Sequence, residues 1–207
     1  MTDVVLTPAA CYPAYPIIAA RGPIAATGVT LDLQSYCFRR EPSIDPGRMQ
    51  MFRQREFVRI GTPASVMQFR KTWMTRAEDL AFRLGLRATL DVANDPFFGR
   101  VGRLLADSQR EQKLKFELLI EIATPEQPTA CTSFNYHGDH FSSIWKFEGA
   151  DGSVIHTACV GFGMERMALA MFREHGFVIS AWPASVRTLL WRGSEQSVLH
   201  HQEVASA

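Results

Sequence analysis

The feature that most constrains the fold is a pair of strand-like runs, residues 34–40 and 51–60, separated by a short turn-forming segment. The separating residues 41–47 contain two prolines, a glycine, an aspartate and a serine, and each of these residue types favours turns. The flanking runs carry the aromatic and β-branched residues that are enriched in strands. We therefore expect a β-hairpin with a long tip, which commits this part of the chain to a β-sheet.

A helix is expected directly after the hairpin. Thr62 and Pro63 provide an N-cap and a proline at the first helical position, and Gly85 ends the run. Between them, apolar residues recur at helical spacing: Val66, Phe69, Trp73, Ala77, Leu80 and Leu84. The pattern predicts a helix over residues 64–84 with Phe69 and Trp73 as core anchors, and a second helix over 164–174 that stops at Gly176.

Three further strands are expected over residues 115–122, 129–135 and 154–160. Residues 7–28 are rich in proline, alanine and glycine and predict irregular connections, and residues 91–99 predict a loop. Strands joined by hairpins and long insertions favour an α+β fold with a mixed, largely antiparallel sheet flanked by helices. We expect one domain over residues 1–193 and a polar tail over 194–207.

Charge and cysteine content exclude several kinds of protein. The chain has 22 Lys and Arg against 21 Asp and Glu, so it has no large positive field with which to hold tRNA or DNA. No apolar run approaches the roughly 20 residues that span a bilayer, and no signal peptide is recognisable, so a cytoplasmic protein without a membrane partner is expected. The four scattered cysteines favour buried thiols or metal ligands over disulfides.

Two motifs carry the chemistry that we expect. The hairpin contains an FRxE strand, Phe38 to Glu41, and a return strand of form RxxxFxxxE, Arg48 to Glu56, while residues 161–166 form a GxGxER entry into the second helix. Arginine side chains bind phosphate groups, and an aromatic ring can stack on adenine. This pairing of motifs resembles that of class II aminoacyl-adenylate-forming enzymes. The resemblance implies Arg39 on the α-phosphate of ATP, Arg166 on the γ-phosphate, and Phe52 stacked on adenine.

Longer strings narrow the resemblance. PAACYP, CFRREPS, ANDPFFGR, LKFELL, SFNYHGDHF and HTACVGFGMER resemble, in one order along the chain, the amino acid:[carrier protein] ligase family. That family is similar to the catalytic core of the atypical zinc-dependent seryl-tRNA synthetases, whose RMHQF motif resembles residues 48–52. It lacks a tRNA-binding domain and loads glycine or alanine onto the phosphopantetheine thiol of a small carrier protein.

The same resemblance implies a zinc ion on Cys11, Glu56 and Cys159, with an open fourth position for the amino group of a small amino acid. It also implies that Glu41 lies beside the α-phosphate and adenine, and that Arg48 and Met49 belong to a loop over ATP. By the same resemblance, four further residues would lie under the ATP: Ala130, Cys131, Thr132 and Ser133. Ser133 would contact ribose or a magnesium ion. Gln127 replaces a magnesium-binding glutamate of seryl-tRNA synthetases, which favours arginine clamping of the phosphates over metal bridging.

The front of the chain departs from the resemblance. Class II enzymes carry a first motif at their dimer interface, and Cys11 already stands at a ligand position, so we expect this chain to lack that motif. The relatives resemble homodimers, and loss of the segment would expose a dimer surface.

Other interpretations of single residues stay open. Any one cysteine is more often a core residue than a ligand, and Cys37 is expected in the core. Cys131, His137 and His140 could form a rival zinc site. A basic surface on helix 64–84, with Arg70, Lys71 and Arg76, would suit an acidic carrier protein.

Three functions are therefore carried forward. The first is an enzyme that activates glycine or alanine with ATP and passes the acyl group to a carrier-protein thiol. The second is an inactive, truncated paralogue that only binds ATP, zinc or a carrier protein. The third is a fragment like a seryl-tRNA synthetase, which the weak net charge and missing tRNA arm disfavour.

Overall fold

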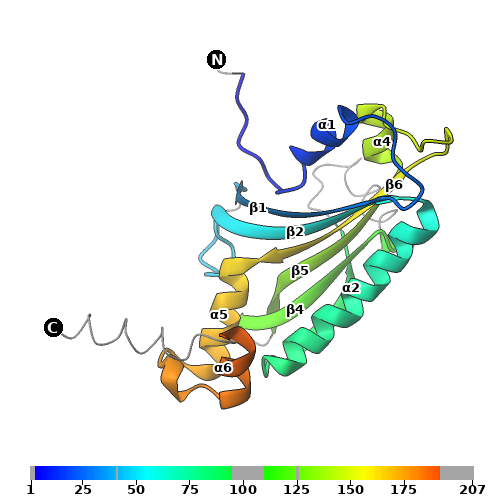
Figure 1. Cartoon of the computed structure of the whole chain (residues 1–207). Helices are drawn as coiled ribbons and strands as arrows, with labels where there is room; N and C mark the ends of the chain where they lie inside the picture. The colour runs from blue at the N-terminus through cyan, green and yellow to red at the C-terminus, as the bar shows by residue number, and fades with distance from the viewer. Residues whose placement is uncertain (1–2, 41, 95–109, 125, 192–207) are drawn as a thin grey trace.

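The computed structural model describes residues 3–40, 42–94, 110–124 and 126–191, and these build one six-stranded sheet with helices on both faces (Figure 1). The strand order is β1-β2-β6-β5-β4-β3, and every neighbouring pair is antiparallel. The strands are β1 (Val29–Phe38), β2 (Met51–Gly61), β3 (Ala88–Ala93), β4 (Lys115–Thr124), β5 (Gln127–Gly138) and β6 (His156–Gly163). The helices are α1 (Ala14–Ala19), α2 (Pro63–Arg83), α4 (His140–Trp145), α5 (Met164–His175) and α6 (Ala184–Leu190), with a 3₁₀ turn at Ile179–Ala181. The expected α+β fold with its antiparallel sheet is confirmed.

The hairpin that opened the sequence analysis is confirmed as β1 and β2. Their register runs from Val29 opposite Ile60 to Phe38 opposite Met51, so β1 begins five residues earlier than expected. β2 then pairs with β6, which leads directly into α5. The hairpin motif and the GxGxER motif are therefore neighbours in the sheet.

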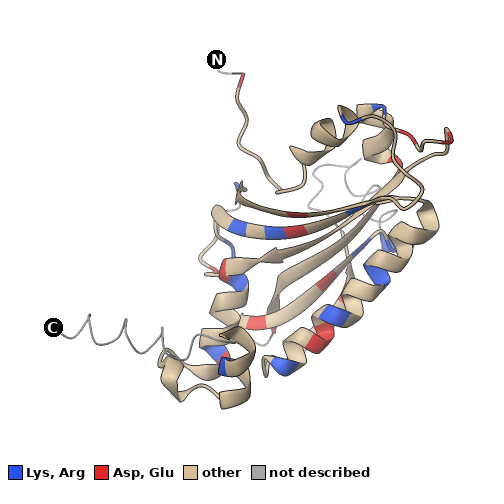
Figure 2. Cartoon of the chain, viewed as in Figure 1, with Lys and Arg blue, Asp and Glu red and all other residues tan. Residues whose placement is uncertain are grey.

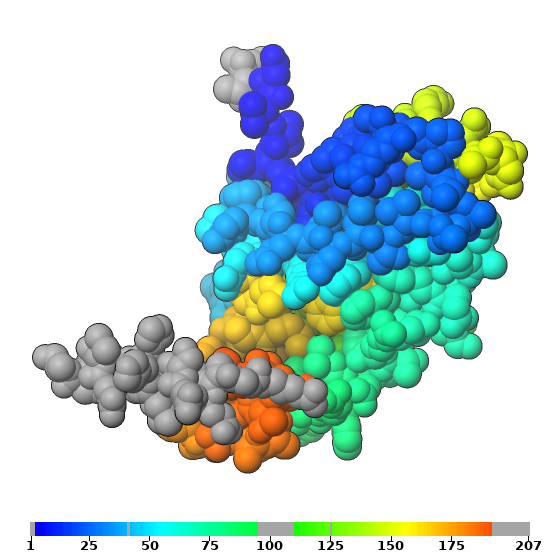
Figure 3. Space-filling view, in the orientation of Figure 1, coloured from blue at the N-terminus to red at the C-terminus, as the bar shows by residue number. Residues whose placement is uncertain are grey.

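The two faces of the sheet bury different clusters. Thr62 caps α2 by accepting a hydrogen bond from the backbone N of Ser65 at 3.3 Å, and Pro63 is its first residue, as expected. The helix packs across one face, where Phe57 stacks on Trp73 with ring centroids 4.4 Å apart. The other face carries α1 and α4 at one end, where Tyr15 and Phe141 stack. In Figure 3 the N-terminal segment lies over this end of the molecule, beside α4.

Three expectations about loops were wrong. Ala88–Ala93 forms the edge strand β3, although its last residues were expected to begin a loop, because pairing with β4 supplies its backbone partners. Residues 7–28 contain the helix α1, which is too short for a helical period to be recognised. β5 continues to Gly138, three residues beyond its expected end at 135, and α4 follows at His140. The rest of the expected loop, residues 95–99, and the tail over 194–207 lie outside the described residues.

None of the helices in the described ranges combines the length and the apolar character that crossing a membrane requires.

Arg70 does not belong to a basic docking surface. Only 7% of this residue is exposed, and its Nη1 donates to the carbonyls of Lys113 at 2.8 Å and Leu114 at 3.1 Å. Its guanidinium carbon also lies 5.3 Å from the ring centroid of Phe116 and 5.6 Å from that of Tyr136. Burial lowers the pKa of Arg70. Of the three expected docking residues, only Lys71 and Arg76 are exposed, among the charges that Figure 2 shows along α2.

We expect Arg70→Ala to lower the free energy of unfolding by ~2–4 kcal/mol, because two backbone carbonyls lose a charged donor and two aromatic rings lose a packing partner. Urea denaturation checks this. Lys71→Ala, on the adjacent exposed position of α2, is the control and should change stability by less than about 0.5 kcal/mol. Equal effects of the two substitutions would contradict the structural role of Arg70.

Candidate active site and metal centre

A cavity of about 460 Å³ opens on the face of the sheet opposite α2. Its lining residues come from β2, β6, β5 and β4, from the segment before α1, from the residues that follow β1, and from α4 and α5. The lining includes ten residues that were named from the sequence as site residues: Cys11, Arg39, Phe52, Glu56, Ala130, Cys131, Thr132, Ser133, Cys159 and Arg166. The structure therefore brings segments from the whole chain to one place.

The pairing of the strands explains this convergence. Residues directly opposite one another on neighbouring strands project to the same face. Gly161 on β6 pairs with both Glu56 on β2 and Ser133 on β5, and Ser133 in turn pairs with Glu117 on β4. Gly161 adds no side chain to this row, and the Gln54 side chain occupies the space over it, between Glu56 and Ser133.

Cys11, Glu56 and Cys159 form a compact cluster. Their candidate ligand atoms all lie within 4.8 Å of one another, and all three residues are buried. The backbone N of Cys11 donates to Oε2 of Glu56 at 2.8 Å, and the backbone N of Ala10 donates to Oε1 of Gln54 at 3.0 Å. Two side chains of β2 thus fix the segment that carries Cys11.

The cluster fits a divalent metal ion. Burial raises the pKa of Glu56, and a hydrogen bond with Cys11, together with burial and the charge of Glu56, raises that of Cys159. Three acidic groups so close in a buried place repel one another once ionised, and a cation would relieve that repulsion. Two thiolates and one carboxylate are donors that zinc accepts, and three protein ligands leave a fourth position open.

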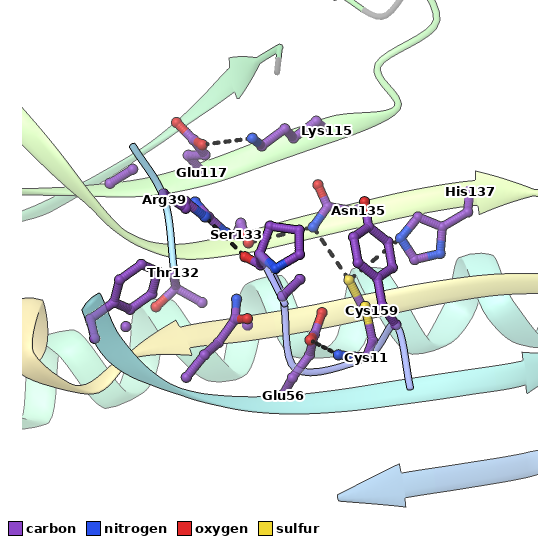
Figure 4. A pocket seen from close by; sticks show the side chains of 18 of the residues that line it. Cys11, Arg39, Glu56, Lys115, Glu117, Thr132, Ser133, Asn135, His137 and Cys159 are labelled. Atoms are coloured by element: carbon purple, nitrogen blue, oxygen red, sulfur yellow. Dashed lines mark hydrogen bonds and ion pairs between the residues drawn. The ribbon is translucent and has the colours of Figure 1, made fainter. Parts of the chain in front are cut away.

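Two arginines and a phenylalanine form the other part of the site. The guanidinium carbons of Arg39 and Arg166 lie 5.2 Å and 5.6 Å from the ring centroid of Phe52. Arg39 Nε donates to the carbonyl of Pro8 at 3.1 Å, and Arg166 donates to the carbonyls of Gly47 at 2.6 Å and Ala130 at 2.9 Å. In Figure 4, Arg39 and Thr132 lie toward one end of the pocket, and Cys159 and His137 lie toward the other. A ligand that joins the two ends would carry negative charge and an aromatic group at one end and a metal-binding group at the other.

Some expected site residues are not part of the cavity. Arg48 is exposed, with its Nε 3.6 Å from Oδ2 of Asp45, and Met49 packs beside the cluster of Cys37 and Phe52; neither lines the cavity. Glu41 lies outside the described residues. Gln127 is exposed at the start of β5 and also lies away from the lining.

The sequence reasoning gave no site role to several polar lining residues, among them Gln54, Lys115, Glu117 and Asn135, and it placed His137 only in the rival zinc site. Lys115 Nζ lies 3.1 Å from Oε1 of Glu117, and both side chains are largely buried. The sequence contained a pattern that could have identified three of these residues. Lys115 and Glu117 alternate with apolar residues in a strand, and Gln54 lies two residues before Glu56 on the same face.

The rival zinc site is wrong. Cys131 and His137 lie on the same strand, six residues apart, which corresponds to roughly 20 Å. Cys131 packs in the core cluster under α2, while His140 is exposed. Within the part of the chain that the structure describes, the metal-type cluster is that of Cys11, Glu56 and Cys159.

Comparisons with known proteins agree with the motifs. No family model matches the chain. It is 56% identical over 188 residues to "Amino acid--[acyl-carrier-protein] ligase 1" of Bradyrhizobium diazoefficiens, covering 91% of this chain and 58% of that protein. It is 55% identical to ligase 2 of the same organism, covering 91% and 56%. A type-2 serine–tRNA ligase of Methanopyrus kandleri is 28% identical and is covered to 37%.

Solved structures show the same fold. The M. kandleri seryl-tRNA synthetase in complex with A. aeolicus tRNASec has a TM-score of 0.74 at 22% identity, with 92% of this chain and 38% of that one covered. The Pyrococcus horikoshii seryl-tRNA synthetase with ATP has a TM-score of 0.65 at 16% identity, with 84% and 40% covered. The class II synthetase-like core and the resemblance drawn from the motifs are confirmed. The chain spans somewhat more than half the length of the ligases that it matches.

We expect Cys37 and Cys131 to resist alkylation in the folded protein. Burial raises the pKa of Cys37 to about 11 and that of Cys131 to about 12. At pH 8 their thiolate fractions are therefore roughly 100-fold and 1,000-fold below that of a cysteine whose pKa is 9.0. Iodoacetamide labelling with mass spectrometry checks this. Both sites should react once urea unfolds the chain, and rapid labelling of either site in the native protein would contradict the expectation.

Proposed function

Because the chain is a close homologue of proteins named amino acid--[acyl-carrier-protein] ligase, we propose that it activates glycine or alanine with ATP and transfers the aminoacyl group to a carrier-protein thiol. The observation that carries this proposal is a single cavity that joins the Cys11, Glu56 and Cys159 cluster to Arg39, Phe52 and Arg166. An aminoacyl-adenylate has an amino group at one end and an adenine at the other, which matches that arrangement.

At the ATP end, the proposed step is attack of the amino acid's carboxylate oxygen on the α-phosphorus, with pyrophosphate as the leaving group. Arg39 stabilises the charge that develops on the α-phosphate, and Arg166 binds the γ-phosphate. Phe52 offers its ring to adenine. The carbonyls of Pro8 and Ala130 orient the two guanidinium groups, so that little reorganisation is needed during the reaction.

At the other end, Cys11, Glu56 and Cys159 would hold a zinc ion. When bound, zinc supplies a positive charge and an open coordination position for an amino group. A Cβ at Gly161 would lie 2.5 Å from Nε2 of Gln54, so the Gln54 side chain covers this glycine between Glu56 and Ser133. Gln54 is itself held by Ala10 and Cys37 and takes up room beside Glu56, which supports a preference for a small amino acid.

In the second step the phosphopantetheine thiol attacks the carbonyl carbon of the adenylate, the bond to the phosphate oxygen breaks, and AMP leaves. No side chain of the protein needs to act as the nucleophile. Ser133 lines the cavity, and Glu117 is its partner across the strands, so these two residues are our candidates for contacts to the magnesium ion that accompanies ATP. Since Arg48 and Met49 do not line the cavity, we assign them no direct contact.

The test is ATP–pyrophosphate exchange by the zinc-loaded chain with glycine, alanine and serine, followed by loading of a phosphopantetheinylated carrier protein. We expect exchange with glycine or alanine, and a loss of about 10²–10³-fold in Arg39→Ala, because a preorganised cation is removed from the developing charge. Arg55→Ala is the matched control. Arg55 lies on the same hairpin, but it pairs with Asp32 at 2.7 Å and does not line the cavity.

Other outcomes decide between the alternatives. ATP binding without exchange in folded, zinc-loaded protein would overturn the enzymatic proposal in favour of a binding protein. Serine-dependent exchange together with charging of tRNA would favour the function of a seryl-tRNA synthetase.

A further inference from the structure

Three buried or partly buried side chains surround the metal cluster, and the proposed reaction gives them no role. Asn135 Nδ2 lies 3.4 Å from Sγ of Cys159, and His137 Nε2 lies 3.5 Å from the same sulfur. Figure 4 shows both side chains reaching Cys159 from β5. Tyr15, on α1, is fully buried beside the cluster.

The hydroxyl of Tyr15 is unusual because it meets no hydrogen-bond partner among the described residues. A buried hydroxyl without a partner destabilises a fold, and phenylalanine would fill the same space without that cost. The ring is held firmly, stacked on Phe141 with centroids 3.9 Å apart. The side chains of Cys11, Cys159 and Glu56 all lie close to this hydroxyl.

The charge of an occupied centre explains these neighbours. Two thiolates and a carboxylate carry three negative charges, of which a divalent ion neutralises two. Thiolate sulfur accepts hydrogen bonds, and metal ligands are commonly oriented by such outer contacts. While the cysteines remain protonated, their thiol sulfurs are only weak acceptors for the donors of Tyr15, Asn135 and His137.

We propose that Tyr15, Asn135 and His137 form the hydrogen-bonding shell that orients the cysteine ligands of this metal centre, with Tyr15 donating to a ligand thiolate. The inference rests on the metal site of the proposed function and goes beyond it, because it assigns positioning residues that do not touch the ion. His137 donates from Nε2 to Cys159, and its Nδ1, 3.0 Å from Oγ1 of Thr157, accepts the proton of that hydroxyl. The hydroxyl of Thr157 is fully buried and can donate or accept, so it is compatible with the tautomer whose Nε2 proton faces the sulfur.

The shell also joins the elements around the cluster. Tyr15 comes from α1, and Asn135 and His137 come from β5, while the ligands come from the segment before α1 and from β2 and β6. The ring of His137 lies edge-on to both Tyr15 and Phe141, with centroids 6.4 Å and 4.9 Å away. Ordering of the thiolates therefore involves the aromatic cluster under α1 and α4.

The experiment measures zinc affinity by competition with a chromogenic chelator, and the sulfur-to-metal charge-transfer band of the cobalt-substituted protein. We expect Tyr15→Phe and His137→Leu each to weaken zinc binding by about 10–100-fold and to shift the cobalt band. His137→Gln, whose Nε2 reaches the same position, should recover most of the affinity. The metal-free Tyr15→Phe protein should melt at the same or a higher temperature, because an unpaired hydroxyl has been removed.

Tyr36→Phe and His140→Gln are the matched controls, because both residues are exposed and lie outside the cluster. If Tyr15→Phe and His137→Leu bind zinc as tightly as the unaltered protein, the inference is overturned while the proposed function stands. If the shell variants lose affinity as expected but the unaltered protein fails in pyrophosphate exchange, the proposed function falls and the shell remains. An unaltered protein that binds no zinc would overturn both.

Discussion

The carboxylate of Glu56 is the interaction on which the site depends. It lies on a central strand, is almost fully buried, and accepts a hydrogen bond from the backbone of Cys11, 45 positions earlier in the sequence. Gln54, two residues before it, holds Ala10 in the same way. These two polar side chains hold the segment before α1 against β2, together with the packing of Ala10 and Cys11 among buried residues of the sheet. The metal-type cluster exists because a strand side chain serves as both an anchor and a candidate ligand.

The alternation of side chains between the two faces of the sheet determines the surroundings of Glu56. Glu56 faces the cavity, and the next residue, Phe57, faces α2 and stacks on Trp73. The same alternation puts Phe134 and Val160 into the core while Ser133 and Cys159 face the cavity. The well-packed side under α2 thus supports the polar side, where packing is incomplete and charged groups gather. This arrangement keeps the side chains of the site in fixed positions without using the core for chemistry.

Much of this could be predicted from the sequence, for reasons that differ between elements. The hairpin and α2 have strong local patterns, so their turn residues, N-cap and apolar period identify them. The ten expected residues that line the cavity lie in strongly patterned motifs. β3 and α1 were not predicted, because an edge strand and a helix of six residues depend for their formation on neighbours in space. Asn135, His137 and Tyr15 could not be assigned, since which residues approach Cys159 depends on strand register and on how α1 packs.

The unbroken length of β5 has a consequence for how this protein can change. Ala130, which accepts a hydrogen bond from Arg166, and Asn135, which contacts Cys159, lie on one strand five residues apart, or roughly 17 Å. The strand therefore sets the distance between the two ends of the cavity. Elsewhere in a strand, one inserted or deleted residue would turn the side chains that follow it to the opposite face. Here the register shifts by one residue between Ala130 and Thr132, opposite Leu118 and Leu119, so the two ends of the cavity keep their common face only while this irregularity is kept.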